Sequence, residues 1–148
     1  MNSSLEPLIY SDKVLDHFEN PRNVGSLESS DGQVGTGMAG TSTIGTVVKM
    51  QIRVDPQEII AKACFKTYGC CSAIACSSLL TEWVKGKTLA EAEAIHHNRI
   101  AEELALLPVK IHCAVLAIEA LQMAIGNYRS KQQSNFVVKL SSVTDSND

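Results

Sequence analysis

The sequence that decides the fold is Val48-Lys49-Met50-Gln51-Ile52-Arg53-Val54, in which apolar and polar side chains alternate at every step. A period of two is typical of a β-strand with one buried face. Asp55-Pro56-Gln57 then forms a turn, and residues 59–68 alternate in the same way. The two runs therefore predict a β-hairpin.

The segment before the hairpin predicts one helix and a loop. Ser11 is a suitable N-cap, and an apolar stripe follows it as far as Phe18. Pro21 then ends the helix, because proline biases the residue before it away from helical angles. Residues 25–45 are rich in Gly, Ser and Thr, which predicts a loop mixed with a short strand.

The chain after Gly69 has helical patterns only. Residues 72–85 predict a helix with Gly86 at its C-cap, and Thr88 to Glu91 form a capping-box pattern that opens a short second helix. Two further helices are predicted, one capped by Asn98 and ending near Leu104, the other beginning at Pro108 and ending near Tyr128. The long last helix is apolar on much of its circumference, so we expect it to be central and buried.

Strands that come first and helices that follow predict an α+β fold, with helices on one face of a small antiparallel sheet. A chain of 148 residues fits one domain. We place this domain at residues 10–131, after an N-terminal extension at 1–9. Residues 132–148 form a polar tail, and we expect the chain from Ser130 onward to be poorly ordered.

The composition is that of an ordinary globular protein, with 45% hydrophobic and 20% charged residues. The net charge is −3 and no basic stripe is visible, so nucleic acid is not an expected partner. Without an uncharged apolar run of membrane-spanning length or a signal-peptide pattern, we expect a cytoplasmic protein that does not cross a membrane. Five cysteines in that compartment predict reduced thiols and not a disulfide framework.

Two predicted helix starts carry thiols that chemistry could use. Cys70 lies where a strand gives way to a helix, and Cys113 lies in the opening turns of the long helix. A thiol near a helix N-terminus has a lowered pKa, because the helix dipole and free N–H groups favour the thiolate. Thiolate is the form that binds metal or attacks a persulfide.

The other cysteines and histidines have plainer interpretations. Cys64 alternates with Lys62 and Lys66, so we expect an exposed strand residue, and Cys76 shares a helical face with Leu80, so we expect core packing. Cys71 could be filler or ligand. The remaining histidines outside the long helix are expected to be solvated: His17, His96 and His97.

His112 and Cys113 are neighbours on a helix and point about 100° apart. We therefore expect no nucleophile–base hydrogen bond between them, which argues against a thiol-dependent hydrolase. Both could still touch a cluster or an ion at the end of the helix.

Three long stretches resemble the U-type iron–sulfur cluster scaffold proteins, the IscU family and the N-terminal domain of NifU. The stretches are 11–25, 65–87 and 100–113, which contain Asn20-Pro21-Arg22-Asn23-Val24-Gly25, Phe65-Lys66-Thr67-Tyr68-Gly69-Cys70 and Pro108-Val109-Lys110-Ile111-His112-Cys113. The resemblance implies a three-stranded antiparallel sheet packed against about five helices. It also implies a scaffold, not an enzyme, on which a [2Fe–2S] cluster is built and handed on.

The resemblance further implies partners and roles. A cysteine desulfurase would supply persulfide sulfur, with Cys113 as the acceptor, and the ligands would include Cys70, His112 and Cys113. An Hsp70-type chaperone and its co-chaperone would bind the chain, with the chaperone at Leu107, Pro108, Val109 and Lys110. A second copy of the chain could complete the site as a dimer around a cluster.

The sequence departs from the family at two expected ligands. Ile44 stands where the family has its first cysteine, and Thr46 stands where it has an aspartate. Neither side chain replaces the lost ligand, and a [2Fe–2S] cluster needs four. Cys71 is the nearest remaining thiol. Two hypotheses stay open. The first is a scaffold that holds iron or a cluster with an altered ligand set. The second is a non-assembling paralogue that regulates the desulfurase or another partner, either without metal or with zinc held by Cys70, His112, Cys113 and either Cys71 or water.

Overall fold

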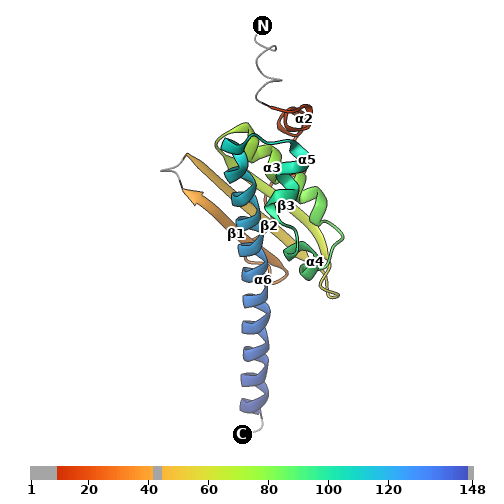
Figure 1. Ribbon diagram of the computed structural model, residues 1–148. Coiled ribbons are helices and arrows are strands. Elements are labelled where there is room, and N and C mark those ends of the chain that lie inside the picture. Colours follow the sequence, from red (N-terminus) through yellow and green to blue (C-terminus); the bar gives the residue numbers. More distant parts are fainter. Residues whose placement is uncertain (1–9, 42–44, 147–148) are drawn as a thin grey trace.

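The computed structural model describes residues 10–41 and 45–146, and for 134–146 it describes the backbone alone. Within these residues, three strands precede most of the helices (Figure 1). The elements in chain order are α2 (Asp12–Glu19), β1 (Val34–Thr41), β2 (Thr46–Val54), β3 (Ile60–Tyr68), α3 (Cys71–Val84), α4 (Leu89–Glu93), α5 (His97–Leu104), the 3-10 turn η1 (Pro108–Lys110) and α6 (Ile111–Ser146). The predicted α+β fold is confirmed.

The sheet has the strand order β1-β2-β3, and both pairs of neighbours are antiparallel. The hairpin predicted from the alternating runs is β2 and β3, in which Met50 pairs with Phe65. Val48, Met50 and Ile52 are completely buried, as the alternation predicts for one face of a strand.

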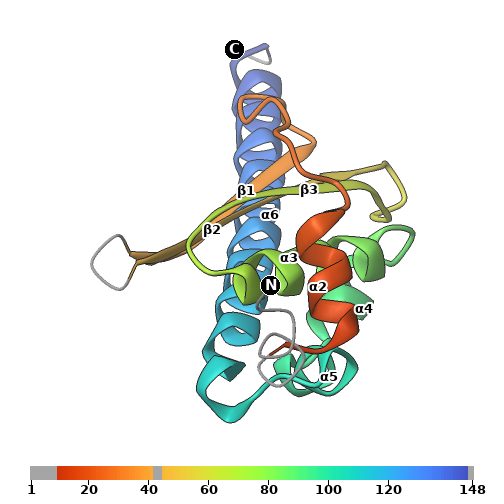
Figure 2. The same ribbon diagram turned by 90° about the horizontal axis from the view of Figure 1, so that it is seen from above.

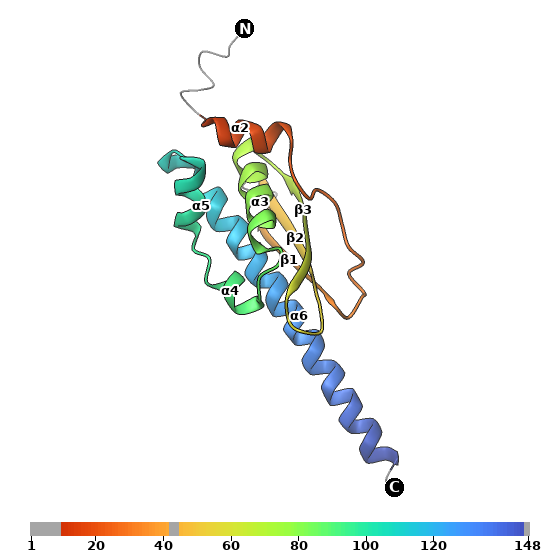
Figure 3. The same ribbon diagram turned by 90° about the vertical axis from the view of Figure 1, so that its right-hand side faces the viewer.

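The helices cover one face of this sheet (Figure 3). Helices α3 and α6 lie side by side against it, and α2 packs on α3 (Figure 2). The opposite face carries the segment between α2 and β1 (Figure 3). That segment is fastened to the sheet at Phe65, whose N–H donates to the Asn23 carbonyl and whose carbonyl accepts from the Gly25 N–H.

Helix α6 packs on β1 at a very short distance, because β1 has glycine where the two elements meet. A Cβ atom at Gly35 would overlap the carbonyl oxygen of Ala124, and one at Gly37 would overlap that of Ala120. Any larger residue would push the helix off the strand. The two glycines therefore fix how closely α6 packs on β1, and with it the position of the start of the helix.

Several predicted boundaries differ from the structure. β1 is eight residues long and fully paired with β2, although its Gly-rich sequence predicts only a short strand within a loop. The N-cap of α5 is His96 and not Asn98, because the His96 Nδ1 atom accepts from the Asn98 N–H. Pro108 begins η1, and the α-helix starts at Ile111.

The end of α6 also differs from the prediction. The helix does not stop near Tyr128 but continues to Ser146, through the part of the chain expected to be poorly ordered. No Gly or Pro occurs between Asn127 and Ser146 to end it. The extension at residues 1–9 lies outside the described residues.

His17 is buried, with 7% of its surface exposed, so the expectation of a solvated side chain is wrong. Its Nδ1 atom lies 2.8 Å from the Ser78 hydroxyl, beneath the chain that leaves α2. Burial lowers the pKa of this imidazole, which favours its neutral form. The predicted core position of Cys76 is confirmed, since Cys76 is completely buried.

The segment Pro108–Gln133 has the length and apolarity of a membrane span, and 50% of its most apolar window is buried inside the fold. Lys110 and Glu119 interrupt this segment, so it is not the uncharged apolar run that the sequence was expected to lack. Because the core helix of a globular protein has the same properties, the segment is weak evidence for a membrane span.

Gly37→Ala should destabilise the protein by about 2–3 kcal/mol, because the new methyl group collides with the α6 backbone. Gly126→Ala is the matched control: a Cβ there meets nothing within 4 Å, and alanine favours the helix by about 0.5–1 kcal/mol. Urea unfolding of the two variants measures both changes. Equal stability of Gly37→Ala and the wild type would show that α6 does not sit this close to β1.

Candidate functional site

The candidate site lies where β3 ends and two helices begin. Cys70 is the N-cap residue of α3, and Cys113 lies in the first turn of α6. The two thiol sulfur atoms are 3.4 Å apart, although 43 residues separate them in the sequence. The two helix starts that the sequence singled out therefore meet at one point.

Cys70 is the thiolate of this pair. Its pKa falls to about 5, first because the Cys113 thiol donates a hydrogen bond to it, and further because the Ala73 and Ser72 N–H groups and the Lys110 ammonium favour a negative charge. An N-cap residue faces the free N–H groups of the first helical turn, so this position stabilises an anion. The sequence prediction of an activated thiol fits Cys70.

Cys113 is the proton donor of the pair. Its side chain is completely buried. The hydrogen bond to Cys70 raises its pKa, and burial raises that pKa further, so the expectation of a lowered pKa is wrong for Cys113. One proton is thus held between two sulfur atoms, as in other strongly coupled acid pairs.

His112 and Cys113 lie within hydrogen-bonding distance of each other, so the expectation that these helical neighbours form no hydrogen bond is wrong. The His112 Nε2 atom lies 3.6 Å from the Cys113 sulfur. The imidazole is long enough to reach across the angle between neighbouring helical positions. Its Nδ1–H donates to the Val109 carbonyl at 3.0 Å, which leaves Nε2 as the free nitrogen. Metal-binding histidines are commonly held in this way by a backbone carbonyl.

Tyr10 is a site residue that the sequence reasoning missed. Its hydroxyl group lies close enough to the half-buried Cys71 thiol to interact with it. This interaction is the main reason why the pKa of Tyr10 rises to about 12, and burial and the nearby Cys70 and Cys113 add to the effect. No sequence signal indicated that the residue before α2 reaches the thiols, because the contact depends on how α2 packs on α3.

Thr46 lies at the start of β2, beside Gly69, the residue before Cys70. It is 6% exposed, and a Cβ at Gly69 would lie 2.9 Å from the Thr46 hydroxyl oxygen. Gly69 also has φ of +133°, which other residues rarely adopt. The strand thus brings a hydroxyl group to the position where the resemblance expected a carboxylate. Ile44 lies outside the described residues.

The spacing of the donor atoms fits a tetrahedral thiolate–imidazole site in part. Zinc bonds of about 2.3 Å to sulfur and about 2.0 Å to nitrogen place two sulfur ligands about 3.7 Å apart and a sulfur and a nitrogen about 3.5 Å apart. The two contacts made by Cys113, at 3.4 and 3.6 Å, are close to these values. Among the described residues, however, no group of three or more His, Cys, Asp or Glu side chains converges on one point. The donor chemistry fits a soft metal, and binding would require the side chains to turn inward.

The segment before α6 presents apolar side chains to solvent. Val109 is 71% exposed and Leu107 is 38% exposed, next to Pro108. Lys110 lies at the end of η1, and its charge lowers the pKa of Cys70. The four residues expected to bind a chaperone thus lie at the edge of the thiol site.

The α+β fold thus brings two thiols and an imidazole together at the end of the sheet, and the comparisons identify the family. The family model of the NifU-like N-terminal domain matches residues 9–135, so the chain belongs to that family. The resemblance seen in the sequence is confirmed.

Curated relatives carry the name iron–sulfur cluster assembly scaffold protein IscU. The chain is 60% identical to the Haemophilus influenzae protein over 84% of this chain and 99% of the relative. It is 59% identical to the Buchnera aphidicola protein from Schizaphis graminum, over 86% and 100% of the two chains, and 58% identical to the Escherichia coli K12 protein, over 86% and 99%.

Solved structures support the fold. The putative iron–sulfur cluster assembly scaffold protein for the SUF system of Fervidobacterium islandicum aligns with a TM-score of 0.64 at 20% identity, over 80% of this chain and 97% of that one. The NifU-like N-terminal protein of Brucella abortus aligns with a TM-score of 0.57 at 18% identity, over 84% and 95%.

Alkylation of the metal-free protein by iodoacetamide should be fastest at Cys70, and its rate should fall only below a pH of about 5, because the thiolate persists down to its pKa. In Cys113→Ala the donated hydrogen bond is lost, so the midpoint should move up toward that of an ordinary thiol. Mass spectrometry of peptides across a pH series measures both midpoints. A Cys70 midpoint near 8.5 in the unsubstituted protein would contradict this assignment.

Proposed function

We propose that this protein is an iron–sulfur cluster assembly scaffold that accepts persulfide sulfur from a cysteine desulfurase in the cytoplasm. As its cargo, it would hold iron or a [2Fe–2S] cluster with an altered ligand set. The observation that carries the proposal is the 3.4 Å approach of the Cys70 and Cys113 sulfur atoms beside the His112 imidazole. The kinship with proteins named as IscU scaffolds supports it.

The ligand set we propose is Cys70, His112 and Cys113, with Cys71 as the fourth. Thiolates are the usual ligands of iron–sulfur clusters, and histidine replaces some of them in known sites. Cys71 follows Cys70 directly and is half-buried beside Tyr10. A second copy of the chain is the other source of a fourth ligand.

We propose Cys113 as the persulfide acceptor. Once the site opens, the burial that raises the pKa of Cys113 is relieved, Cys113 loses its proton to solvent, and its thiolate attacks the outer sulfur of the desulfurase persulfide. A new sulfur–sulfur bond forms on Cys113, the desulfurase bond breaks, and the desulfurase cysteine leaves as thiolate. Because Cys113 is completely buried, the site must open for this transfer.

The partners proposed are the desulfurase and an Hsp70-type chaperone with its co-chaperone. The exposed Leu107 and Val109 offer an apolar segment that a chaperone could grip. Lys110 links that segment to the thiols through its charge.

Thr46 favours a second candidate function. It brings a neutral hydroxyl group to a site where the family has a carboxylate ligand, and it is nearly buried, so it offers a metal little. A paralogue that binds and regulates the desulfurase without assembling a cluster would tolerate this change. Zinc held by Cys70, His112, Cys113 and Cys71 would suit that function as a structural ion.

Anaerobic reconstitution with Fe²⁺, cysteine and a desulfurase should give visible absorption with equal amounts of iron and sulfide. The absorption should disappear in Cys70→Ala and in Cys113→Ala, because each removes a cluster ligand. Cys64→Ala is the control, since Cys64 lies in the middle of β3, six residues before Cys70. Metal and sulfide analysis provides the measurement.

A colourless protein that still binds the desulfurase would overturn the scaffold proposal and support the regulator. A protein that binds zinc but contains no sulfide would support the same conclusion. If Cys71→Ala keeps the full absorption, then Cys71 is not the fourth ligand and a dimeric site should be sought by sedimentation.

A further inference from the structure

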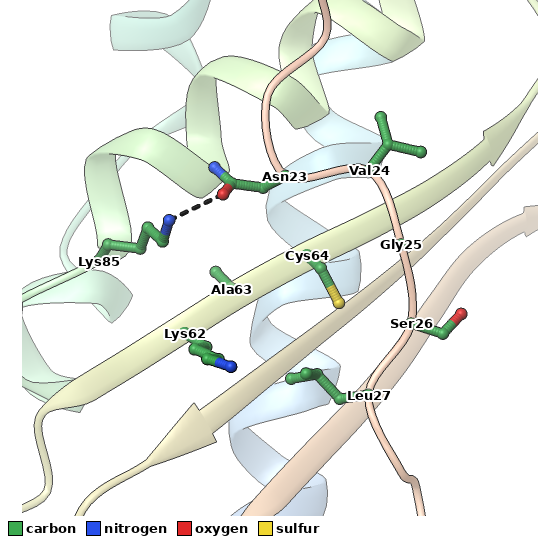
Figure 4. Close-up of a pocket in the computed structure, with 9 residues that line it drawn as sticks. All are labelled: Asn23, Val24, Gly25, Ser26, Leu27, Lys62, Ala63, Cys64 and Lys85. Atoms are coloured by element: carbon green, nitrogen blue, oxygen red, sulfur yellow. Dashed lines mark hydrogen bonds between the residues drawn. The ribbon is translucent and has the colours of Figure 1, made fainter.

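The face of the sheet that carries no helices has a hollow of about 260 Å³ next to β3. Nine residues line it, from the segment after α2, from β3 and from the end of α3: Asn23, Val24, Gly25, Ser26, Leu27, Lys62, Ala63, Cys64 and Lys85 (Figure 4). Two of the nine are lysines and none is acidic. The hollow lies on the side of the sheet opposite the helices.

Cys64 forms part of the floor of this hollow. It is only 9% exposed, so the sequence expectation of an exposed strand residue is wrong. The segment at Val24 to Leu27 covers it, a long-range contact that strand alternation does not reveal. Burial raises the pKa of this thiol, and the charges of Lys49, Lys62 and Lys66 oppose that rise. The charges of three lysines therefore act on the Cys64 thiol, and one of these lysines, Lys62, lines the hollow.

The arrangement of positive charges around the hollow is unfavourable for the protein alone. Lys62 pairs across the sheet with Arg53, and Lys66 pairs with Lys49. Like charges that face each other across two strands destabilise a sheet. Asp31 forms an ion pair with Arg53 at 2.9 Å. Within the part of the chain that the structure describes, no ion pair involves Lys62 or Lys85.

The walls of the hollow are held in place before any ligand arrives. The Asn23 side chain accepts from the Lys85 ammonium at 2.7 Å (Figure 4) and donates to the Thr81 hydroxyl at 3.1 Å. The Leu27 N–H donates to the Gln51 side chain at 2.8 Å. A preformed hollow with two lysines needs little ordering to bind a ligand.

We propose that this hollow binds a compact anion with two or more negative charges, carried by carboxylate or phosphate groups. Lys62 and Lys85 bind its charged groups from two sides. The volume lies below the range of about 300–1,000 Å³ typical of drug-sized ligands, so the anion is a small metabolite or an inorganic phosphate. A recess lined by one sign of charge concentrates such anions even on a protein of net charge −3.

Titration of the full chain with pyrophosphate and with citrate, at constant ionic strength, tests the proposal by amide NMR. Saturable shifts are expected for residues 24–27 and 62–64. Lys62→Gln and Lys85→Gln should each weaken binding about tenfold, the effect of losing one charge-assisted hydrogen bond. Lys66→Gln is the control, because Lys66 lies on the same strand and face but does not line the hollow.

Shifts that do not saturate, or equal weakening of binding by Lys66→Gln, would overturn the proposal. Both results would indicate non-specific electrostatic attraction of anions to this face and not a binding site. Hexaglutamate is the third probe. If it binds at these residues while pyrophosphate and citrate do not, the face docks an acidic protein and the small-anion site is wrong. None of these results depends on whether the thiol site assembles a cluster.

Discussion

The contact between α6 and the glycines of β1 is the constraint on which the rest of the structure depends. Gly35 and Gly37 let the helix backbone lie against the strand, and that depth sets where the helix begins. Its first turn then places Cys113 within 3.4 Å of Cys70, which β3 and α3 position independently. The thiol pair is therefore a consequence of sheet–helix packing and not of local sequence.

The electrostatics of the site follow from the same geometry. One sulfur atom sits at a helix N-cap and becomes the thiolate, while the other is buried and keeps its proton. A pair in these two states offers a metal one ready ligand and a second that must lose its proton on binding. The hydroxyl group of Thr46 adds no charge, so the site relies on sulfur and imidazole for its ligands.

The sequence predicted the elements whose signals are local. The alternation of β2 and the capping box at Thr88 each depend on a few neighbouring residues. β1 was harder to predict because glycine has a low propensity for strands. The glycines of β1 instead allow α6 to pack closely against the strand. The burial of Cys64 and His17, the reach of Tyr10 and the contact of His112 with Cys113 depend on side-chain packing and long-range coverage. The sequence patterns identified Cys70 and Cys113 as candidate site residues, but they did not predict that the two sulfur atoms are in contact.

Binding of phenylarsine oxide tests the central claim most directly, because trivalent arsenic bridges two thiols only when their sulfur atoms are a few ångströms apart. The account predicts one tightly bound arsenical per metal-free chain, lost in Cys70→Ser and in Cys113→Ser but kept in Cys71→Ser. Binding that survives Cys113→Ser and disappears in Cys71→Ser would show that the reactive pair is the sequence neighbours Cys70 and Cys71. That result would contradict a site built by the packing of α6 on β1.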